Sequence, residues 1–265
     1  MVRLGLELPS RLLALASSSH SGEARHLDGA REILAEAGLD SSALQTPPEF
    51  PLDPIVRDAW IQSGRRPTRI GMNCSGKHSA MLATCRLRGW STHDYLDPGH
   101  PLQVAILDEV RSLTGDPVTE VGIDGCGAPV HVMSLRGLAR AGSAAVLASA
   151  DSPERRVADA MREHPEMVGG ADRDVTAFMR AVPGLLAKDG AEGVYVAALP
   201  DGTGIAMKVE DGSARGRQVA MAAILLRVAP TGTSRAVLEA LASIPMLGGG
   251  RPVGAVESPL RIPTD

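Results

Sequence analysis

Two neighbouring segments late in the chain constrain its fold more than any other feature. The segments Val194–Leu199 and Ile205–Val209 have the alternation typical of strands, and Asp201-Gly202-Thr203-Gly204 between them predicts a hairpin loop. A hairpin pairs its two strands in antiparallel fashion. Helical patterns outnumber strand patterns elsewhere, so the sequence predicts an α+β fold with an antiparallel sheet.

Periodicity and capping residues predict helices over most of the remaining chain. We expect them at 21–37, 53–63, 76–88, 101–113, 134–149, 153–163, 172–182, 215–228 and 233–243. Short strands are predicted at 69–72 and 118–123, whereas the apolar run at 12–16 fits either a buried strand or a helix end. The Gly- and Pro-rich residues 248–265 predict a loosely held tail.

Composition limits the classes of partner that the protein can have. Aromatic residues make up 2% of the 265 residues and the formal net charge is −4, so a nucleic-acid partner lacks support. No apolar run approaches the length that spans a bilayer, and Glu7, Pro9 and Arg11 interrupt the run that a signal peptide would need. We therefore expect a soluble, cytoplasmic protein without nucleic-acid or membrane partners, whose three cysteines are thiols or metal ligands.

The stretch Asn73-Cys74-Ser75-Gly76-Lys77-His78 carries the densest reactive chemistry in the sequence. Only three of the 27 basic residues are lysines, at positions 77, 188 and 208. Arginine serves where only charge matters, but a guanidinium does not give up its proton as an amine can, so each lysine is a candidate for chemistry. At the start of a helix, Cys74, Lys77 and His78 stand at i, i+3 and i+4 and share one face.

A second cysteine, Cys126, closes a predicted strand in a Gly-rich turn and could meet Cys74 at one site. As a third metal ligand, Lys77 would need a neutral amine, which costs roughly 4–5 kcal/mol near pH 7. A well-formed zinc site releases on the order of 10 kcal/mol, so this cost does not exclude zinc. The helix dipole alone favours the Cys74 thiolate by only ~0.3–1 kcal/mol.

Other interpretations of the cysteines remain open at this point. Spacing alone ranks two inert thiols first and a metal site second. A disulfide between Cys74 and Cys126 is disfavoured in the cytosol, and a Cys74 nucleophile with Lys77 as its base is a further alternative. Cys85 shares the apolar face of its predicted helix, so we assign it to the core.

Three further motifs have ordinary interpretations when each is taken alone. Ser19-His20 follows an apolar run and could present a nucleophilic serine, although clustered serines usually cap helices. Lys188 precedes a turn and would be a surface lysine, and Lys208, in an alternating strand, is expected to face solvent. His164 and Glu166 are expected in an exposed loop.

Together, and in this order, the motifs closely resemble the L-asparaginase II family, amidohydrolases with a serine-β-lactamase-like fold. The similarity runs from about residue 5 to residue 255. It rests on five segments: Ser19-His20-Ser21-Gly22-Glu23, Asn73-Cys74-Ser75-Gly76-Lys77-His78, Gly122-Ile123-Asp124-Gly125-Cys126, His164-Pro165-Glu166-Met167-Val168 and Lys188-Asp189-Gly190. The resemblance implies a single domain over residues 1–265 with a serine-β-lactamase/glutaminase-like fold, in which an antiparallel sheet has flanking helices and a helical region.

Members of this family hydrolyse the side-chain amide of L-asparagine to L-aspartate and ammonia. The resemblance therefore implies L-asparagine as the substrate, and Ser19 with Lys188 as a catalytic serine–lysine pair. We also expect a homodimer. Hydrolysis of another amide, such as glutamine, by a hydrolase of the same fold is a weaker alternative.

The resemblance also implies a zinc cofactor bound by Cys74, Lys77 and Cys126, which raises the metal hypothesis above the inert thiols. Three protein ligands leave a fourth position open on a tetrahedral zinc ion, as catalytic zinc sites require. Three more residues are expected to line the substrate pocket: His20, His78 and Asp124.

One part of the family pattern is missing. The second catalytic pair of the family is a Ser-x-x-Lys on a helix upstream of the Ser-His motif, where the amine lies one turn from the hydroxyl. This chain has no Ser-x-x-Lys, because Cys74, Leu185 and Ile205 stand three positions before its lysines. The family's N-terminal strands and that helix are thus expected to be absent, either because the start is assigned at an internal methionine or because the chain is truly truncated. True truncation predicts an inactive remnant that binds zinc and amino acids.

Overall fold

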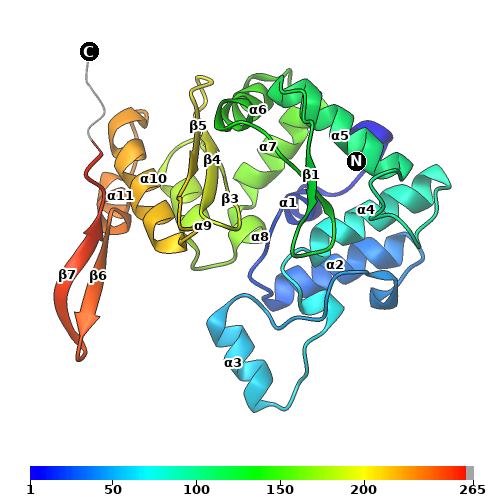
Figure 1. Cartoon of the computed structure of the whole chain (residues 1–265), viewed down its shortest axis with the longest axis horizontal. Coiled ribbons are helices and arrows are strands. Elements are labelled where there is room, and N and C mark those ends of the chain that lie inside the picture. The colour runs from blue at the N-terminus through cyan, green and yellow to red at the C-terminus, as the bar shows by residue number, and fades with distance from the viewer. Residues whose placement is uncertain (261–265) are drawn as a thin grey trace.

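The computed structural model describes residues 1–260, which form a helical body, a small antiparallel sheet and a C-terminal ribbon (Figure 1). The helices are α1 Ser10–Ala16, α2 Ala24–Glu36, α3 Pro54–Gln62, α4 Ser75–Arg88, α5 Pro101–Thr114, α6 Leu135–Leu147, α7 Pro153–Glu163, α8 Pro165–Gly169, α9 Asp174–Ala181, α10 Ala214–Val228 and α11 Arg235–Leu241. The strands are β1 Val121–Ile123, β2 Pro129–His131, β3 Leu186–Asp189, β4 Val194–Ala198, β5 Gly204–Lys208, β6 Ser243–Gly248 and β7 Arg251–Glu257. Helices with antiparallel pairing agree with the predicted α+β class.

Capping residues in the sequence set the helix boundaries. Asp53 accepts a hydrogen bond from a backbone amide in the first turn of α3, and Ser152 does the same for α7. Each of these caps is followed by a proline, whose fixed φ suits the first helical position. At the other end, α4 and α5 stop at Gly89 and Gly115, which adopt the left-handed conformation.

Close packing of α1 against α4 brings two predicted site segments together. Gly76 faces Leu15 so closely that a Cβ atom on the glycine would lie 2.9 Å from the Leu15 carbonyl oxygen. Glycine is therefore needed at this contact. The His20 amide donates a hydrogen bond to the Asn73 carbonyl (2.8 Å), which ties the segment after α1 to the start of α4.

The antiparallel sheet β3-β4-β5 carries two of the three lysines, Lys188 and Lys208. The pairing of β4 with β5 confirms the predicted hairpin, and Lys208 on β5 is exposed as predicted. Helix α6 packs on the sheet through Gly142, where a Cβ atom would lie 3.3 Å from Val196. Lys188 lies on β3, opposite Val196 in the register of the sheet.

The core is built mainly from aliphatic residues, alanine and methionine, and the aromatic residues Trp60, Tyr95, Phe178 and Tyr195 are buried in it. One continuous cluster of buried apolar side chains extends from Leu6 to Leu238. Cys85 belongs to it and is fully buried, as predicted. No helix within residues 1–260 is long and apolar enough to cross a membrane.

Two local expectations were wrong. Residues 69–72 do not form a strand: a short 3-10 helix spans Arg69–Gly71, and the Thr68 side chain caps it. A stretch of four residues, Arg69 to Met72, is too short for periodicity to separate a strand from a helical turn. The predicted loop at His164 and Glu166 is instead the five-residue helix α8, and both side chains are half-buried. The ambiguous run at 12–16 lies in helix α1.

The tail is more ordered than its composition suggested. β7 pairs with β6 in an antiparallel ribbon, and Gly249 and Gly250 form the turn with positive φ angles. The expectation of a loose tail from residue 248 is corrected for the stretch up to Glu257. The same glycines that suggested looseness are the residues that the tight turn requires. Residues 261–265 lie outside the described part of the chain.

Candidate active site

Three segments distant in the sequence bring the predicted reactive side chains together. Cys74 directly precedes α4, Lys77 lies in the first turn of α4, and Cys126 lies in the turn between β1 and β2. The Lys77 Nζ donates a hydrogen bond to Cys126 Sγ (3.5 Å). Ligand atoms of Cys74, Asp124 and Cys126 lie within 4.8 Å of one another, and Ser19 Oγ lies 4.0 Å from Cys74 Sγ. The two cysteines thus meet at one site, as their positions at element ends suggested.

The turn between β1 and β2 directs Cys126 inward. Asp124 closes this turn: its Oδ1 accepts from the Gly125 amide (2.9 Å) and its carbonyl accepts from the Gly127 amide (2.8 Å). Gly127 has a φ of 87°, in the left-handed region that glycine tolerates. Cys126 is consequently buried, and its Sγ lies 3.2 Å from Asp124 Oδ2.

The two thiols have opposite titration behaviour. A hydrogen bond from Cys126, helped by the charge of Lys77 and by Ser19, lowers the pKa of Cys74 to about 6, although burial opposes this. The same interaction with Cys74, together with burial, raises the pKa of Cys126 to about 12. The two thiols therefore titrate as a pair, and their interaction favours the thiolate form of Cys74. The hydrogen bond, more than the helix dipole, favours this form.

Lys77 is held protonated by its neighbours when no metal is bound. Burial lowers the pKa of this amine, but the charges of Cys74, Cys126 and Asp124 outweigh burial and raise the pKa above its usual value. The Lys77 Nζ also lies 3.9 Å from Asp124 Oδ2. The amine would have to lose its proton before it could donate a lone pair to a metal ion.

His78 contributes a buried nitrogen to the same cluster. Its Nδ1 is hydrogen-bonded to the Tyr95 hydroxyl (2.8 Å), whereas its buried Nε2 has no hydrogen-bond partner. His78 is among the groups that act to lower the pKa of Cys126, so the ring lies close to that thiol. Tyr95 therefore fixes the orientation of His78 toward the cysteines.

The donor chemistry of the cluster fits a zinc ion. Thiolate sulfurs, a nitrogen and a carboxylate oxygen are the ligands that zinc takes in proteins. Cys74, Cys126 and Asp124 could hold a metal ion together, and the Lys77 amine contacts the Cys126 sulfur. The unpartnered His78 Nε2 shows that the surroundings of Cys126 have an unused polar group.

Ser19 and Lys188 approach the cluster from α1 and from the sheet. Ser19 is half-buried and follows α1, whereas Lys188 extends from β3 and donates to the carbonyl of Asp189. Burial lowers the pKa of Lys188, the Arg173 charge lowers it further, and Asp189 and Cys74 act in the opposite direction. Within residues 1–260 no hydrogen bond joins Ser19 Oγ to Lys188 Nζ, so their pairing stays a prediction.

His20, the residue after Ser19, is buried and contacts the start of α4. It is fully buried and stacks on His26 with ring centroids 5.0 Å apart. The Gly22 amide donates to His20 Nδ1 (3.1 Å), so the proton of the neutral ring sits on Nε2, which lies 3.0 Å from Ser75 Oγ. Both ring nitrogens are occupied, and the predicted role of His20 in the substrate pocket stays a prediction.

Sequence reasoning missed two residues that contact the predicted pair. Arg173 donates to the Ser19 carbonyl and forms an ion pair with Asp189. Asp189 is buried and follows Lys188 directly. Its position in the Lys188-Asp189-Gly190 motif was the sequence signal that could have identified it. Nothing in the sequence distinguished Arg173 from the other arginines.

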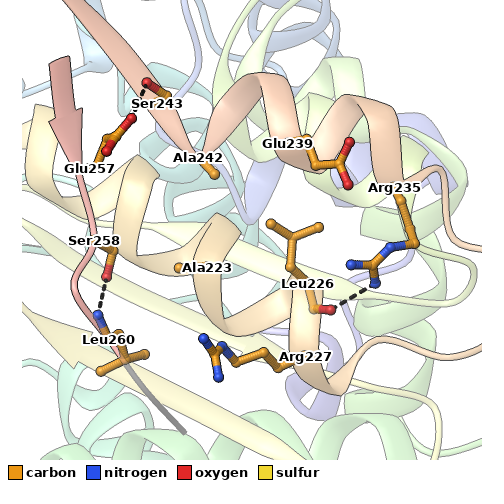
Figure 2. Close-up of a pocket in the computed structure, with 10 residues that line it drawn as sticks. All are labelled: Ala223, Leu226, Arg227, Arg235, Glu239, Ala242, Ser243, Glu257, Ser258 and Leu260. Atoms are coloured by element: carbon orange, nitrogen blue, oxygen red, sulfur yellow. Dashed lines mark hydrogen bonds between the residues drawn. The ribbon is translucent and has the colours of Figure 1, made fainter. Parts of the chain in front are cut away.

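A surface hollow of about 440 Å³ shares no residue with this cluster (Figure 2). It lies between α10, α11 and β7 and is lined by residues such as Arg235 and Glu239. Arg235 donates to the Leu226 carbonyl (2.8 Å), and Ser243 donates to Glu257 (3.3 Å). None of the described lysines or cysteines lines the hollow, so we assign the candidate active site to the cysteine cluster instead.

The comparison with known families bears on the resemblance drawn from the motifs. A family model described as L-asparaginase II matches residues 1–258. The chain belongs to the L-asparaginase II family. A search among curated proteins found no match. Membership of the L-asparaginase II family confirms the resemblance drawn from the motifs, and it identifies the protein as an asparaginase-type amidohydrolase.

Proposed function

We propose that the protein hydrolyses the side-chain amide of L-asparagine to L-aspartate and ammonia. The observation that carries this proposal is the convergence of Ser19 with the Cys74–Cys126 cluster in a chain that belongs to the L-asparaginase II family. Lys188, whose pKa is lowered chiefly by burial and is also affected by the charge of Cys74, is the proposed base. Hydrolysis of L-asparagine needs an activated nucleophile and a polar pocket that accepts the zwitterionic substrate.

In the proposed mechanism Ser19 is the nucleophile and Lys188 is the base. The Ser19 oxygen bonds to the amide carbon while neutral Lys188 takes the hydroxyl proton. Lys188 then returns the proton to the leaving nitrogen, and ammonia departs as the carbon–nitrogen bond breaks. Water, deprotonated by the same lysine, hydrolyses the resulting ester and releases L-aspartate. Lys188 must turn from Asp189 toward Ser19 for these steps.

We propose zinc as the cofactor, held by Cys74, Lys77 and Cys126. Asp124 is close enough to provide a further oxygen ligand. Zinc supplies Lewis-acid polarisation and orientation of a carbonyl or carboxylate when it is bound. The residues themselves exclude water around the thiols, and Tyr95 orients His78 as a wall of the pocket. We also propose the serine-β-lactamase-like fold, which the family resemblance supports, together with a homodimer and a cytoplasmic location.

Ammonia release tests the proposed reaction. The protein is incubated with L-asparagine and, in parallel, with L-glutamine, and ammonia is measured over time. Changing Lys188 to Met should lower the rate with L-asparagine about 10²- to 10⁴-fold, because general-base catalysis is lost. Lys208→Met is the matched control, because Lys208 is an exposed lysine on the same sheet. Equal rates for the two variants would remove Lys188 from the mechanism.

A second candidate is a protein that binds zinc and L-asparagine or L-aspartate without turnover. The absence of a Ser-x-x-Lys from the sequence favours it, because the family resemblance implies that pair as well. A rise in the melting temperature with L-aspartate, without ammonia release from either amide, would favour this candidate over the hydrolase.

A further inference from the structure

Arg173 contacts both halves of the proposed catalytic pair. It lies at the N-terminal boundary of α9, and one Nη donates to the carbonyl of Ser19. The other Nη pairs with the carboxylate of Asp189, the residue after Lys188. One planar guanidinium thus spans the segment after α1 and the end of β3.

Asp189 is held in a fixed position by burial and by several ion pairs. Its side chain is 3% exposed, and a second arginine, Arg217 of α10, approaches the same Oδ2 at 3.2 Å. Arg217 also donates to the Gly190 carbonyl (2.7 Å), so the end of β3 is fixed by more than one bond. Lys188 Nζ lies 3.4 Å from Asp189 Oδ1. The carboxylate therefore connects Lys188 with two arginines from different helical elements.

The segment that carries Ser19 is held by backbone hydrogen bonds on both sides of that residue. The Ser18 amide bonds to the Leu15 carbonyl (3.1 Å), and the His20 amide bonds to the Asn73 carbonyl (2.8 Å). Between them, Arg173 is the hydrogen-bond donor that the structure gives to the Ser19 carbonyl within residues 1–260. This bond links the Ser19 backbone to Arg173 and, through Arg173, to Asp189 at the end of β3.

We infer that Arg173 is a positioning residue that holds Ser19 in register with Lys188 through the Asp189 carboxylate. The inference rests on the proposed function of Ser19 and Lys188. An arginine suits the task because its rigid fork reaches two acceptors at once, whereas the single ammonium of lysine does not reproduce that geometry. A displacement of about 1 Å at a reacting group costs on the order of 100-fold in rate.

Steady-state kinetics separate positioning from substrate binding. For Arg173→Lys and Arg173→Gln we expect kcat with L-asparagine to fall about 10- to 100-fold, with the lysine variant less affected and KM within about 2-fold of the original. The matched control is Arg180→Gln, because Arg180 is on the same helix in an exposed ion pair with Glu166. A raised KM with an unchanged kcat would overturn the inference and make Arg173 a ligand of the substrate carboxylate.

Amide hydrogen exchange tests the same inference without relying on turnover. In Arg173→Gln we expect faster exchange over residues 17–22, while residues 186–190 keep their protection through Arg217. Unchanged exchange over residues 17–22 would overturn the positioning role even in a protein that releases no ammonia. Absence of ammonia from the unmodified protein, with faster exchange in the variant, would reject the proposed reaction and retain the Arg173 connection. Far-ultraviolet circular dichroism verifies that each variant is folded.

Discussion

Cys74 has the lower pKa of the two paired thiols, and this pKa depends on its partner. The hydrogen bond from Cys126 is the largest cause of the lowered pKa, while burial acts against it. Changing Cys126 to Ala in metal-free protein should therefore raise the pKa of Cys74 from about 6 toward or above the ordinary thiol value. The pH dependence of iodoacetamide alkylation, followed by mass spectrometry, measures this change.

Cys85 is the internal control for that titration. It is fully buried in the core, and burial raises its pKa to about 11, so it should stay unreactive over the same pH range in both proteins. An alkylation midpoint of Cys74 that stays near pH 6 without Cys126 would contradict the assignment of the lowered pKa to the hydrogen bond from Cys126.

The sequence predicted the meeting of the two cysteines but not their charges. Cys74 and Cys126 each stood at the end of a predicted element, where side chains are presented together. The helix dipole was the only electrostatic effect visible without coordinates, and it is too weak to form the thiolate. The decisive hydrogen bond joins residues from separate segments, so no local pattern could reveal it. Arg173 escaped prediction for the same reason, because its partners lie in the segment after α1 and on β3.

At the scale of the elements, two stacked histidines join the start of α2 to the segment after α1. His20 and His26 are buried, and burial is the main cause that lowers the pKa of each ring. Below about pH 6.5 the unfolded chain binds protons that the folded chain excludes, so the free energy of unfolding falls as the pH falls. We expect up to about 1.4 kcal/mol per pH unit from each histidine.

Urea unfolding between pH 7 and pH 5 measures this dependence. His26→Gln should flatten the decline, because one of the two groups that take up a proton on unfolding is removed. The matched control is His93→Gln, since His93 is exposed and its removal should leave the slope unchanged. A slope in His26→Gln that equals the slope of the original protein would contradict the assignment to the stacked pair.

Elements with strong local signals were predicted well, and weakly marked ones were not. The β4–β5 hairpin had a Gly-rich loop between alternating segments, and α7 had a Ser-Pro start. In contrast, α8 has five residues, fewer than two helical turns, and so no periodicity to detect. The ribbon of β6 and β7 looked like a tail because its turn glycines resemble those of a linker. Its distinguishing feature is pairing, which composition does not encode.

At the scale of the whole molecule, the candidate site connects the helical body with the sheet. Cys74 comes from α4, Cys126 from the β1–β2 turn and Lys188 from β3, which Figure 1 shows as separate parts of the chain. The α+β class followed from element order, whereas this arrangement depends on contacts such as that of Gly76 with Leu15. A ligand that binds Cys74 and Cys126 together would therefore stabilise the relation between α4 and the turn.

Zinc should consequently raise the melting temperature of the protein. A ligand present at 1,000 times its dissociation constant stabilises the folded state by about 4.1 kcal/mol, which corresponds to on the order of 10 °C in a chain of this length. Thermal unfolding of chelator-treated protein, with and without added zinc, measures the shift. In Cys126→Ala the shift should largely disappear, whereas Cys85→Ala, which alters a core thiol outside the cluster, should keep it. Equal melting temperatures with and without zinc would mean that Cys74 and Cys126 form a thiol pair and not a metal site.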